Sequence, residues 1–390
     1  MKKLNLLLAL SLSYLTIGCT SYVILFKPPV QLDPVPIKES AVVRTPEDGE
    51  TEQVSWSMEA IGMDAKYFAA KTGKTGNKNV KVAILSTGVD YNHEDLVGQV
   101  LVNRNEITEA VDINPSINYK DDDGNGIKDD IVGYDVVDGD YMAYDHHGAG
   151  TAVAGIIAAK ANGYGVKGML DEVSLYPIRY INDNGQSDVP KLTSALTHAL
   201  KVAKADIVFI QSLDLPLGGG QMQNADATSL EKSMLTAALA EYAKTEVPIV
   251  VGAGESLQNF KETTLGEVFL GSANVVVVTS TDKEGKLGLL ANHGNRVVRL
   301  AAPGEKILTT APGNKYAEVR GTAYAAAHVV GTLAMAKSKY GETLKLKDHV
   351  MPTLASARAN TPSDYIEFAT RSGAILNVPK VMSAIEEKMN

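Results

Sequence analysis

An acidic run at residues 121–130 places side chains at a spacing that suits metal binding, Asp-Asp-Asp-Gly-Asn-Gly-Ile-Lys-Asp-Asp. Oxygen donors at alternate positions, followed by a glycine that permits a sharp turn, are typical ligands of a hard cation such as calcium. We expect the ligands to be Asp121, Asp123, Asn125 and Asp129. Val132 stands at the twelfth position, where an EF-hand carries Glu, so the loop is not an EF-hand. A solvated acidic loop without a metal is the alternative.

Cys19 is the only cysteine in the sequence. One cysteine excludes an internal disulfide and a zinc site built from cysteines. Lys2 and Lys3 precede an apolar run, residues 4–17, that is shorter than the roughly 20 residues a membrane span needs. This arrangement predicts a secretion signal.

Residues 15–19, Leu-Thr-Ile-Gly-Cys, resemble the lipobox of bacterial lipoproteins, in which the cysteine is lipidated and becomes the mature N-terminus. Thr16 departs from the leucine that is usual three residues before the cysteine. The resemblance implies a bacterial cell-envelope lipoprotein anchored to the membrane through Cys19. Thr20, which is not Asp, favours the outer membrane if the source bacterium has one. An uncleaved anchor and an ordinary signal peptide are the alternatives.

The composition is that of a soluble globular protein, with 45% hydrophobic and 21% charged residues, so a sizeable core can be buried. The formal net charge of the 390 residues is −9. Phosphate binding needs clustered Lys and Arg, and the sequence has no such cluster. We therefore expect no nucleic acid as a partner.

The chain divides into three parts: a signal peptide at residues 1–18, a lipidated cysteine and extended tether at 19–55, and a folded domain at 56–390. The tether carries five prolines and no sustained hydrophobic period. In the domain, strand-like and helix-like stretches alternate. The expected strands are residues 80–85, 173–178, 206–211, 248–251 and 275–279, and the expected helices are 150–161, 189–203 and 229–244. Such alternation predicts a mostly parallel sheet covered by helices on both faces.

Residues 321–331, Gly-Thr-Ala-Tyr-Ala-Ala-Ala-His-Val-Val-Gly, resemble the Gly-Thr-Ser-x-Ala-x-Pro-His-Val-x-Gly segment of subtilisin-like serine proteases. Other motifs of that family have counterparts in the family's order, at residues 81–90, 149–157, 249–255, 301–304 and 372–377. The resemblance covers roughly residues 56–390. It implies an α/β fold, the subtilisin-like three-layer α/β/α architecture with a mostly parallel central sheet.

The four reactive positions of the family pattern carry other residues in this chain. Ser86 stands at the catalytic Asp position, Ala149 at the His position and Ala323 at the Ser position. Glu255 replaces the Asn that helps to form the oxyanion hole. An alanine methyl cannot attack a carbonyl, and no imidazole is present to take a proton. An ionised Glu255 would also place negative charge where an oxyanion must develop.

Two rearranged catalytic sites deserve comparison with this degenerate one. His147, in the Asp-His-His run that begins at Asp145, is a candidate relocated base, but we favour polar loop residues that precede a helix. A sedolisin-like Ser-Glu-Asp triad would need an acid near Ala149 and a serine at 323, and both are absent. His93 and His328 match positions that are structural in the family, so we expect structural roles for them.

The sequence thus favours a membrane-anchored pseudoprotease that binds or scaffolds a peptide or protein of unknown identity, with calcium as a candidate cofactor. Two alternatives stay open. One is a serine endopeptidase, either as an inactivated variant or as an enzyme weakly active through a shifted site. The other is a purely structural lipoprotein.

Overall fold

The computed structural model describes residues 51–70, 74–106, 119–211, 225–354 and 364–390. The expected signal peptide, Cys19 and the tether up to residue 50 lie outside these described residues. Within the described ranges, no helix is both long enough and apolar enough to cross a membrane.

Seven described strands form one sheet, in which each neighbouring pair is parallel. In spatial order they are β2 (Tyr134–Asp135), β3 (Glu172–Arg179), β1 (Gly76–Ser86), β4 (Ile207–Ile210), β5 (Ile249–Gly252), β6 (Val275–Thr281) and β7 (Val298–Pro303). A separate antiparallel hairpin consists of β8 (Ile307–Ala311) and β9 (Lys315–Val319).

Helices connect and cover these strands. The α-helices are α1 (Trp56–Ala60), α2 (Ala65–Ala70), α3 (Ala149–Ala158), α4 (Val189–Lys201), α5 (Ala225–Tyr242), α6 (Thr264–Phe269), α7 (Thr322–Tyr340), α8 (Met351–Leu354), α9 (Asp364–Ala369) and α10 (Val378–Met389). Four shorter helical turns are η1 (Arg104–Glu106), η2 (Phe260–Glu262), η3 (Gly341–Thr343) and η4 (Leu346–Val350).

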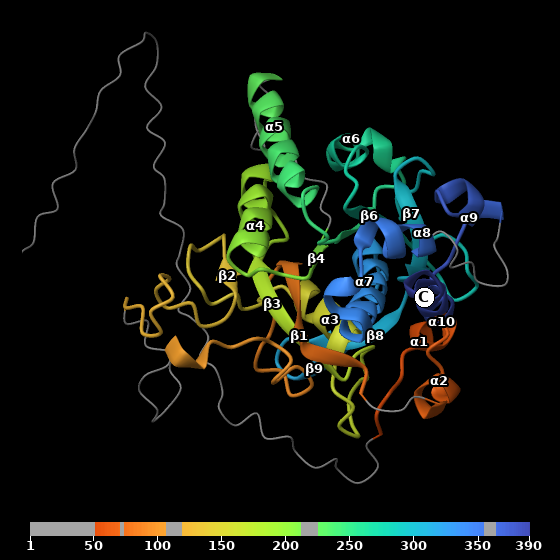
Figure 1. The fold of residues 1–390 in the computed structure, drawn as a ribbon, viewed down its shortest axis with the longest axis horizontal. Helices are drawn as coiled ribbons and strands as arrows, with labels where there is room; N and C mark the ends of the chain where they lie inside the picture. Colours follow the sequence, from red (N-terminus) through yellow and green to blue (C-terminus); the bar gives the residue numbers. More distant parts are fainter. Residues whose placement is uncertain (1–50, 71–73, 107–118, 212–224, 355–363) are drawn as a thin grey trace, which may run out of the picture. The chain divides into compact units, whose positions relative to one another are not determined.

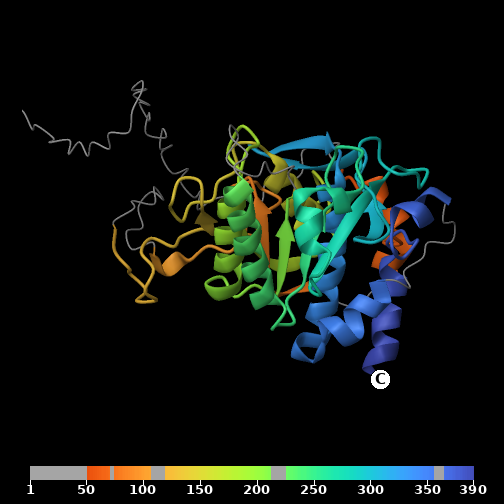
Figure 2. The ribbon, with the colours of Figure 1, turned by 90° about the horizontal axis from the view of Figure 1, so that it is seen from above.

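The alternation of side chains along β1 shows how the layers form. Val82 and Ile84 belong to the core that includes α3 and α7, whereas Ala83 and Leu85 belong to the core that includes α4 and α5. Successive strand residues point to opposite faces, so both faces of the sheet are buried against helices. Figures 1 and 2 show α4 and α5 lying side by side over their face. The predicted three-layer α/β/α arrangement with a parallel sheet is confirmed.

Element boundaries differ from the sequence prediction mainly where the strands leave the core. β1 begins at Gly76 rather than at residue 80, and the register of its pairing with β3 shifts between Gly76 and Lys81. Asn77 is polar and partly buried, and Lys78 and Asn79 are exposed, so hydrophobic periodicity does not detect this part of the strand. Conversely, α4 ends at Lys201, two residues before its predicted end.

The carboxyl edge of the sheet is where this fold can place a site. β1 ends at Ser86 and β5 ends at Gly252, and α3 and α7 begin beside these two strand ends. In open parallel sheets, ligands bind outside the carboxyl ends of the strands.

Candidate functional site

The four positions singled out from the sequence lie in two pairs at the carboxyl edge of the sheet, where glycines allow close approach of a helix to a strand. A Cβ on Gly150 would lie 1.9 Å from the Gly88 carbonyl oxygen and 3.2 Å from the Ser86 Cβ, so α3 starts directly against the end of β1. A Cβ on Gly252 would lie 2.7 Å from the Ala323 nitrogen, so α7 starts directly against the end of β5.

Ser86 has no basic partner at this site. Its side chain is buried, and its hydroxyl donates a hydrogen bond to the Gln211 Oε1 at 3.3 Å. Gln211 was missed by sequence reasoning, because it follows β4 and matches no motif. The methyl groups of Ala149 and Ala323 are also buried, at 6% and 4% exposure. An amide partner cannot remove a proton from a hydroxyl, so Ser86 is not activated as a nucleophile.

Asp145 lies in the loop that precedes α3, and its side chain is fully buried. Its carboxylate accepts hydrogen bonds from the Thr87 hydroxyl at 2.8 Å, from the Thr151 hydroxyl and from the backbone N–H groups of His147, Gly148 and Thr151. Gly148, the residue before α3, offers no side-chain cap of its own. Asp145 therefore caps the N-terminus of α3 from three residues upstream, as an acidic side chain does favourably at a helix start.

His146 and His147 are both exposed. Within the described part of the chain, neither donates to or accepts from a hydroxyl group, and the His146 ring lies 5.0 Å from that of Tyr144. The loop-residue interpretation of His147 is consistent with this placement.

Glu255 makes the contact that distinguishes this site. Its Oε1 accepts a hydrogen bond from the backbone N–H of Thr322 in the first turn of α7. Gly321, with φ of 140°, precedes the helix without a side-chain cap, and a Cβ there would lie 2.9 Å from the Glu255 Oε1. The carboxylate thus binds the positive end of a 19-residue helix. The carboxylate thereby occupies the Thr322 N–H, a donor of the kind that stabilises an oxyanion in an oxyanion hole.

Two further polar groups of the site are a hydrogen-bonded hydroxyl and an uncharged phenol. The Thr322 hydroxyl is buried and accepts the Gly254 N–H at 2.8 Å. Burial, and then the nearby negative charges of Glu255 and Asp145, raise the pKa of Tyr324 to about 12. Tyr324, which sequence reasoning did not single out, therefore stays a neutral phenol at physiological pH. Among the described residues of this site, no histidine forms a hydrogen bond with the Ser86 or Thr322 hydroxyl.

His328 has the structural role that the resemblance implied. It is fully buried, with Nδ1 at 2.8 Å from the Tyr324 carbonyl oxygen and Nε2 at 2.9 Å from the Ser57 hydroxyl. Burial lowers the pKa of His328 to about 4, so the ring is neutral near pH 7. This serine–histidine pair is closed to solvent and joins α1 to α7. His93 likewise contacts backbone, with Nε2 at 3.0 Å from the Lys315 carbonyl oxygen.

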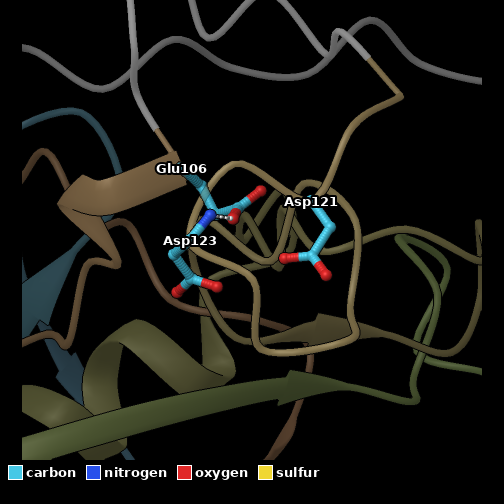
Figure 3. A group of neighbouring side chains, drawn as sticks. All are labelled: Glu106, Asp121 and Asp123. Atoms are coloured by element: carbon cyan, nitrogen blue, oxygen red, sulfur yellow. Dashed lines mark hydrogen bonds between the residues drawn. The ribbon is translucent and has the colours of Figure 1, made fainter.

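The acidic loop brings two of the predicted ligands, Asp121 and Asp123, close to a third carboxylate, that of Glu106. Carboxylate oxygens of Asp121, Asp123 and Glu106 lie within 4.8 Å of one another, and Figure 3 shows the three side chains around one turn of the loop. Glu106, from η1, is buried and accepts the backbone N–H groups of Asp123 and Asp129 at 2.9 and 3.0 Å. Sequence reasoning missed Glu106 because residues 107–120 separate it from the acidic run.

The other two predicted ligands lie differently. The Asn125 amide nitrogen donates to Asp123 and Asp130 at 3.0 Å, and its Oδ1 accepts the Ile127 N–H at 2.8 Å. Asp129 is not a member of the three-carboxylate group. A set of three carboxylates is nevertheless the donor chemistry that a hard cation prefers.

Comparisons with known proteins agree with the predicted family and fold. Residues 77–368 match the model of the Subtilase family. The chain is 31% identical to the Major intracellular serine protease of Bacillus subtilis over 271 residues, which cover 69% of this chain and 72% of that one. It is 28% identical to the Intracellular serine protease of Paenibacillus polymyxa over 335 residues, covering 84% and 86% of the two chains. A solved structure of a cold adapted subtilisin-like serine proteinase superposes with a TM-score of 0.59 at 22% identity, covering 83% of this chain and 97% of that one.

Proposed function

Since this chain belongs to the Subtilase family, we propose that it is a pseudoprotease, a subtilisin-like domain that binds a peptide or protein without cleaving it. One observation carries the proposal: all four reactive positions are replaced while the elements that hold them are retained. Ser86 is paired with an amide, Ala149 and Ala323 carry methyl groups, and Glu255 occupies the helix N-terminus.

The replacements act together against hydrolysis. A serine protease needs a hydroxyl nucleophile, an imidazole to take its proton and a carboxylate to orient that imidazole. It also needs hydrogen-bond donors that are free to stabilise the oxyanion, and here a carboxylate already accepts one such N–H. A cleft of this kind can still bind an extended peptide, because peptide binding uses shape and backbone hydrogen bonds rather than the triad.

The second candidate is a weakly active serine endopeptidase, and the names of the relatives favour it, since the matched proteins are called serine proteases. It would need a working nucleophile outside the family positions. A fluorophosphonate probe distinguishes the two candidates, because only a protein with a working serine or threonine nucleophile would react with it.

Selection of random peptides against the protein tests the binding half of the proposal. We expect enriched peptides whose affinity falls at least about tenfold in Ala149→Arg, because a long charged side chain at the start of α3 would fill the cleft. Glu284→Arg, on an exposed turn, is the matched control and should leave affinity unchanged. Peptides that bind the wild type and Ala149→Arg equally would exclude the cleft, and an absence of enriched peptides would favour a purely structural lipoprotein.

We further propose that the chain is a lipoprotein of the bacterial cell envelope, anchored through Cys19 in the outer membrane where the source has one. The support is the lipobox-like run at residues 15–19. We expect the wild-type protein to incorporate labelled fatty acid and to sediment with membranes, whereas Cys19→Ser should do neither. Membrane retention of Cys19→Ser equal to that of the wild type would contradict lipid anchoring.

Calcium is proposed for the carboxylate group formed by Glu106, Asp121 and Asp123. Three like charges gathered within 4.8 Å repel one another, and a divalent cation would offset that repulsion. At a calcium concentration about 100 times its Kd, binding should stabilise the fold by about 2.7 kcal/mol, measured by urea unfolding with and without a chelator. Asp123→Asn should lose most of this effect, and Glu284→Gln should retain it. No heat of binding and an unchanged melting temperature would contradict the proposed calcium site.

A further inference from the structure

A pocket with a volume of about 520 Å³ lies away from the degenerate site. Its walls come from β1, from residues 101–103, from the acidic loop and from the end of α4. Lys81, on β1, lines it and lies five residues before Ser86, which is about 16 Å along a strand. The pocket shares no residue with the site around Glu255.

The charges of this pocket oppose those of the chain as a whole. Lys81, Lys201 and Lys204 line it together with one carboxylate, that of Asp130, whereas the net charge of the chain is −9. Lys201 and Lys204 stand at the end of α4, where the helix dipole favours cations. Lys81 comes from a different element, so a helix end does not account for the third charge.

The ammonium of Lys81 is held in a position where an anion would stabilise it. Its Nζ donates to the Ala203 carbonyl oxygen at 2.7 Å and lies 5.9 Å from the centroid of the Tyr176 ring. Burial lowers the pKa of Lys81, and the charge of Lys204 lowers it further against the opposing effect of Asp206. Among the described residues, no carboxylate forms an ion pair with any of the three lysines. An ammonium has three donors, and the hydrogen bond that the Lys81 ammonium makes within the described ranges is to the Ala203 carbonyl oxygen.

Asp130 and two apolar residues of the lining define the rest of the ligand. Asp130 is fixed in the pocket, because the side-chain amides of Asn103 and Asn125 both donate to its carboxylate. This negative charge disfavours an anionic group beside it and so favours placement of that group at the lysines. Leu101 and Ile131 add apolar surface. A volume of about 520 Å³ is in the range of small-molecule sites.

We propose that this pocket binds a small organic anion, a carboxylate or phosphate head on an apolar body, with the head on Lys81 and Lys204 and the body against Leu101 and Ile131. The ligand is of small-molecule size and is separate from the peptide of the degenerate cleft. The pocket is also connected to the acidic loop, since the Asn103 amide nitrogen donates to both Asp123 and Asp130 at 2.9 Å.

Calorimetric titration of the full chain with octanoate and with octyl phosphate tests the proposal, with octanol and octyltrimethylammonium as uncharged and cationic counterparts. We expect at least one anion to bind about tenfold more tightly than octanol, and the cation not to bind. If octanoate binds the more tightly the head is a carboxylate, and if octyl phosphate does so it is a phosphate. Octanol binding as tightly as both anions would overturn the proposal.

Lys81→Met should weaken binding of the preferred anion by about tenfold, because it keeps an unbranched apolar side chain and removes the charge. Lys204→Gln, at an exposed position, provides a second variant that does not depend on the buried contacts of Lys81 and should weaken binding by about threefold. Lys283→Met, an exposed lysine on a distant turn, is the matched control and should bind as the wild type does. Unchanged affinity in both Lys81→Met and Lys204→Gln would exclude a role for these lysines in binding the anion.

Discussion

The wild-type chain should leave a fluorophosphonate probe unreacted and should hydrolyse a peptide amide no faster than buffer does. In subtilisin, removing the triad lowers turnover by about a millionfold. In this chain positions 86, 149 and 323, at the carboxyl edge of the sheet, carry Ser, Ala and Ala instead of the Asp, His and Ser that the family resemblance implies. Labelling of any serine or threonine that heat denaturation abolishes would contradict the pseudoprotease proposal.

The combined change Ser86→Asp, Ala149→His, Ala323→Ser and Glu255→Asn should raise amide hydrolysis by at least about a thousandfold over the wild type. The expected gain is below a millionfold, because Gln211 now contacts residue 86 and would have to move for an aspartate to meet the new histidine. The same change with Ala323 retained is the matched control, since it restores everything except the nucleophile. It should stay inert.

A quadruple variant that folds but does not react would also be informative. It would mean that the retained strands and helices no longer hold a peptide in the cleft, which favours a purely structural protein. Circular dichroism and a melting temperature near that of the wild type must accompany such a result. Residue 86 is fully buried, and a new carboxylate there costs stability unless the histidine pairs with it.

Acid should destabilise this fold through its buried neutral histidines, and His328 should account for about 2–3 kcal/mol between pH 7.5 and pH 4.5. Burial lowers the pKa of His328 from 6.5 to about 4. A lowered histidine pKa means that the folded state binds fewer protons than the unfolded state. The stabilisation is therefore complete above about pH 6.5 and is lost as the pH falls toward 4.

Urea unfolding of the wild type and His328→Gln at both pH values measures this contribution. The variant should be less stable than the wild type at pH 7.5, where the contacts to Ser57 and Tyr324 matter, and the gap should narrow at pH 4.5. His146→Gln, at an exposed position, should show the pH dependence of the wild type. An equal pH dependence in His328→Gln and wild type would show that His328 does not titrate with folding.

His198 should add to the same acid sensitivity from the other face of the sheet. Burial lowers its pKa to about 4, and its ring stacks on Tyr134 at 4.2 Å between centroids. Its Nε2 lies 3.0 Å from the Tyr176 hydroxyl. His198 and His328 belong to helices on opposite faces, so their effects on the free energy of unfolding should add.

Much of the architecture was predictable because it depends on local patterns. The apolar run at residues 80–85 and the small residues of 150–161 are enough to predict a strand and a helix, and the order of such elements predicts a parallel sheet. A local signal also marks the start of α10, where Asn377 caps the helix by accepting the Lys380 N–H at 3.1 Å. The polar first residues of β1 were not predicted, because they carry no hydrophobic pattern.

The candidate site divides along the same line. The residue type at each of the four reactive positions is given by the sequence, so the replacements at 86, 149, 255 and 323 could be identified without a structure. The contacts that the replacing side chains make could not be predicted. Gln211 pairs with Ser86 and Glu255 binds Thr322, each across a large separation in sequence.

The sequence by itself therefore determined the family, the order of strands and helices, and which residues stand at positions 86, 149, 255 and 323. Only the tertiary structure decided that Glu255 caps α7, that Glu106 joins Asp121 and Asp123, and that Lys81 and Lys204 line one pocket. The physical reason is the topology. Parallel strands with helical crossovers bring together residues from separate segments, and the contacts between them depend on register and packing that no local pattern encodes.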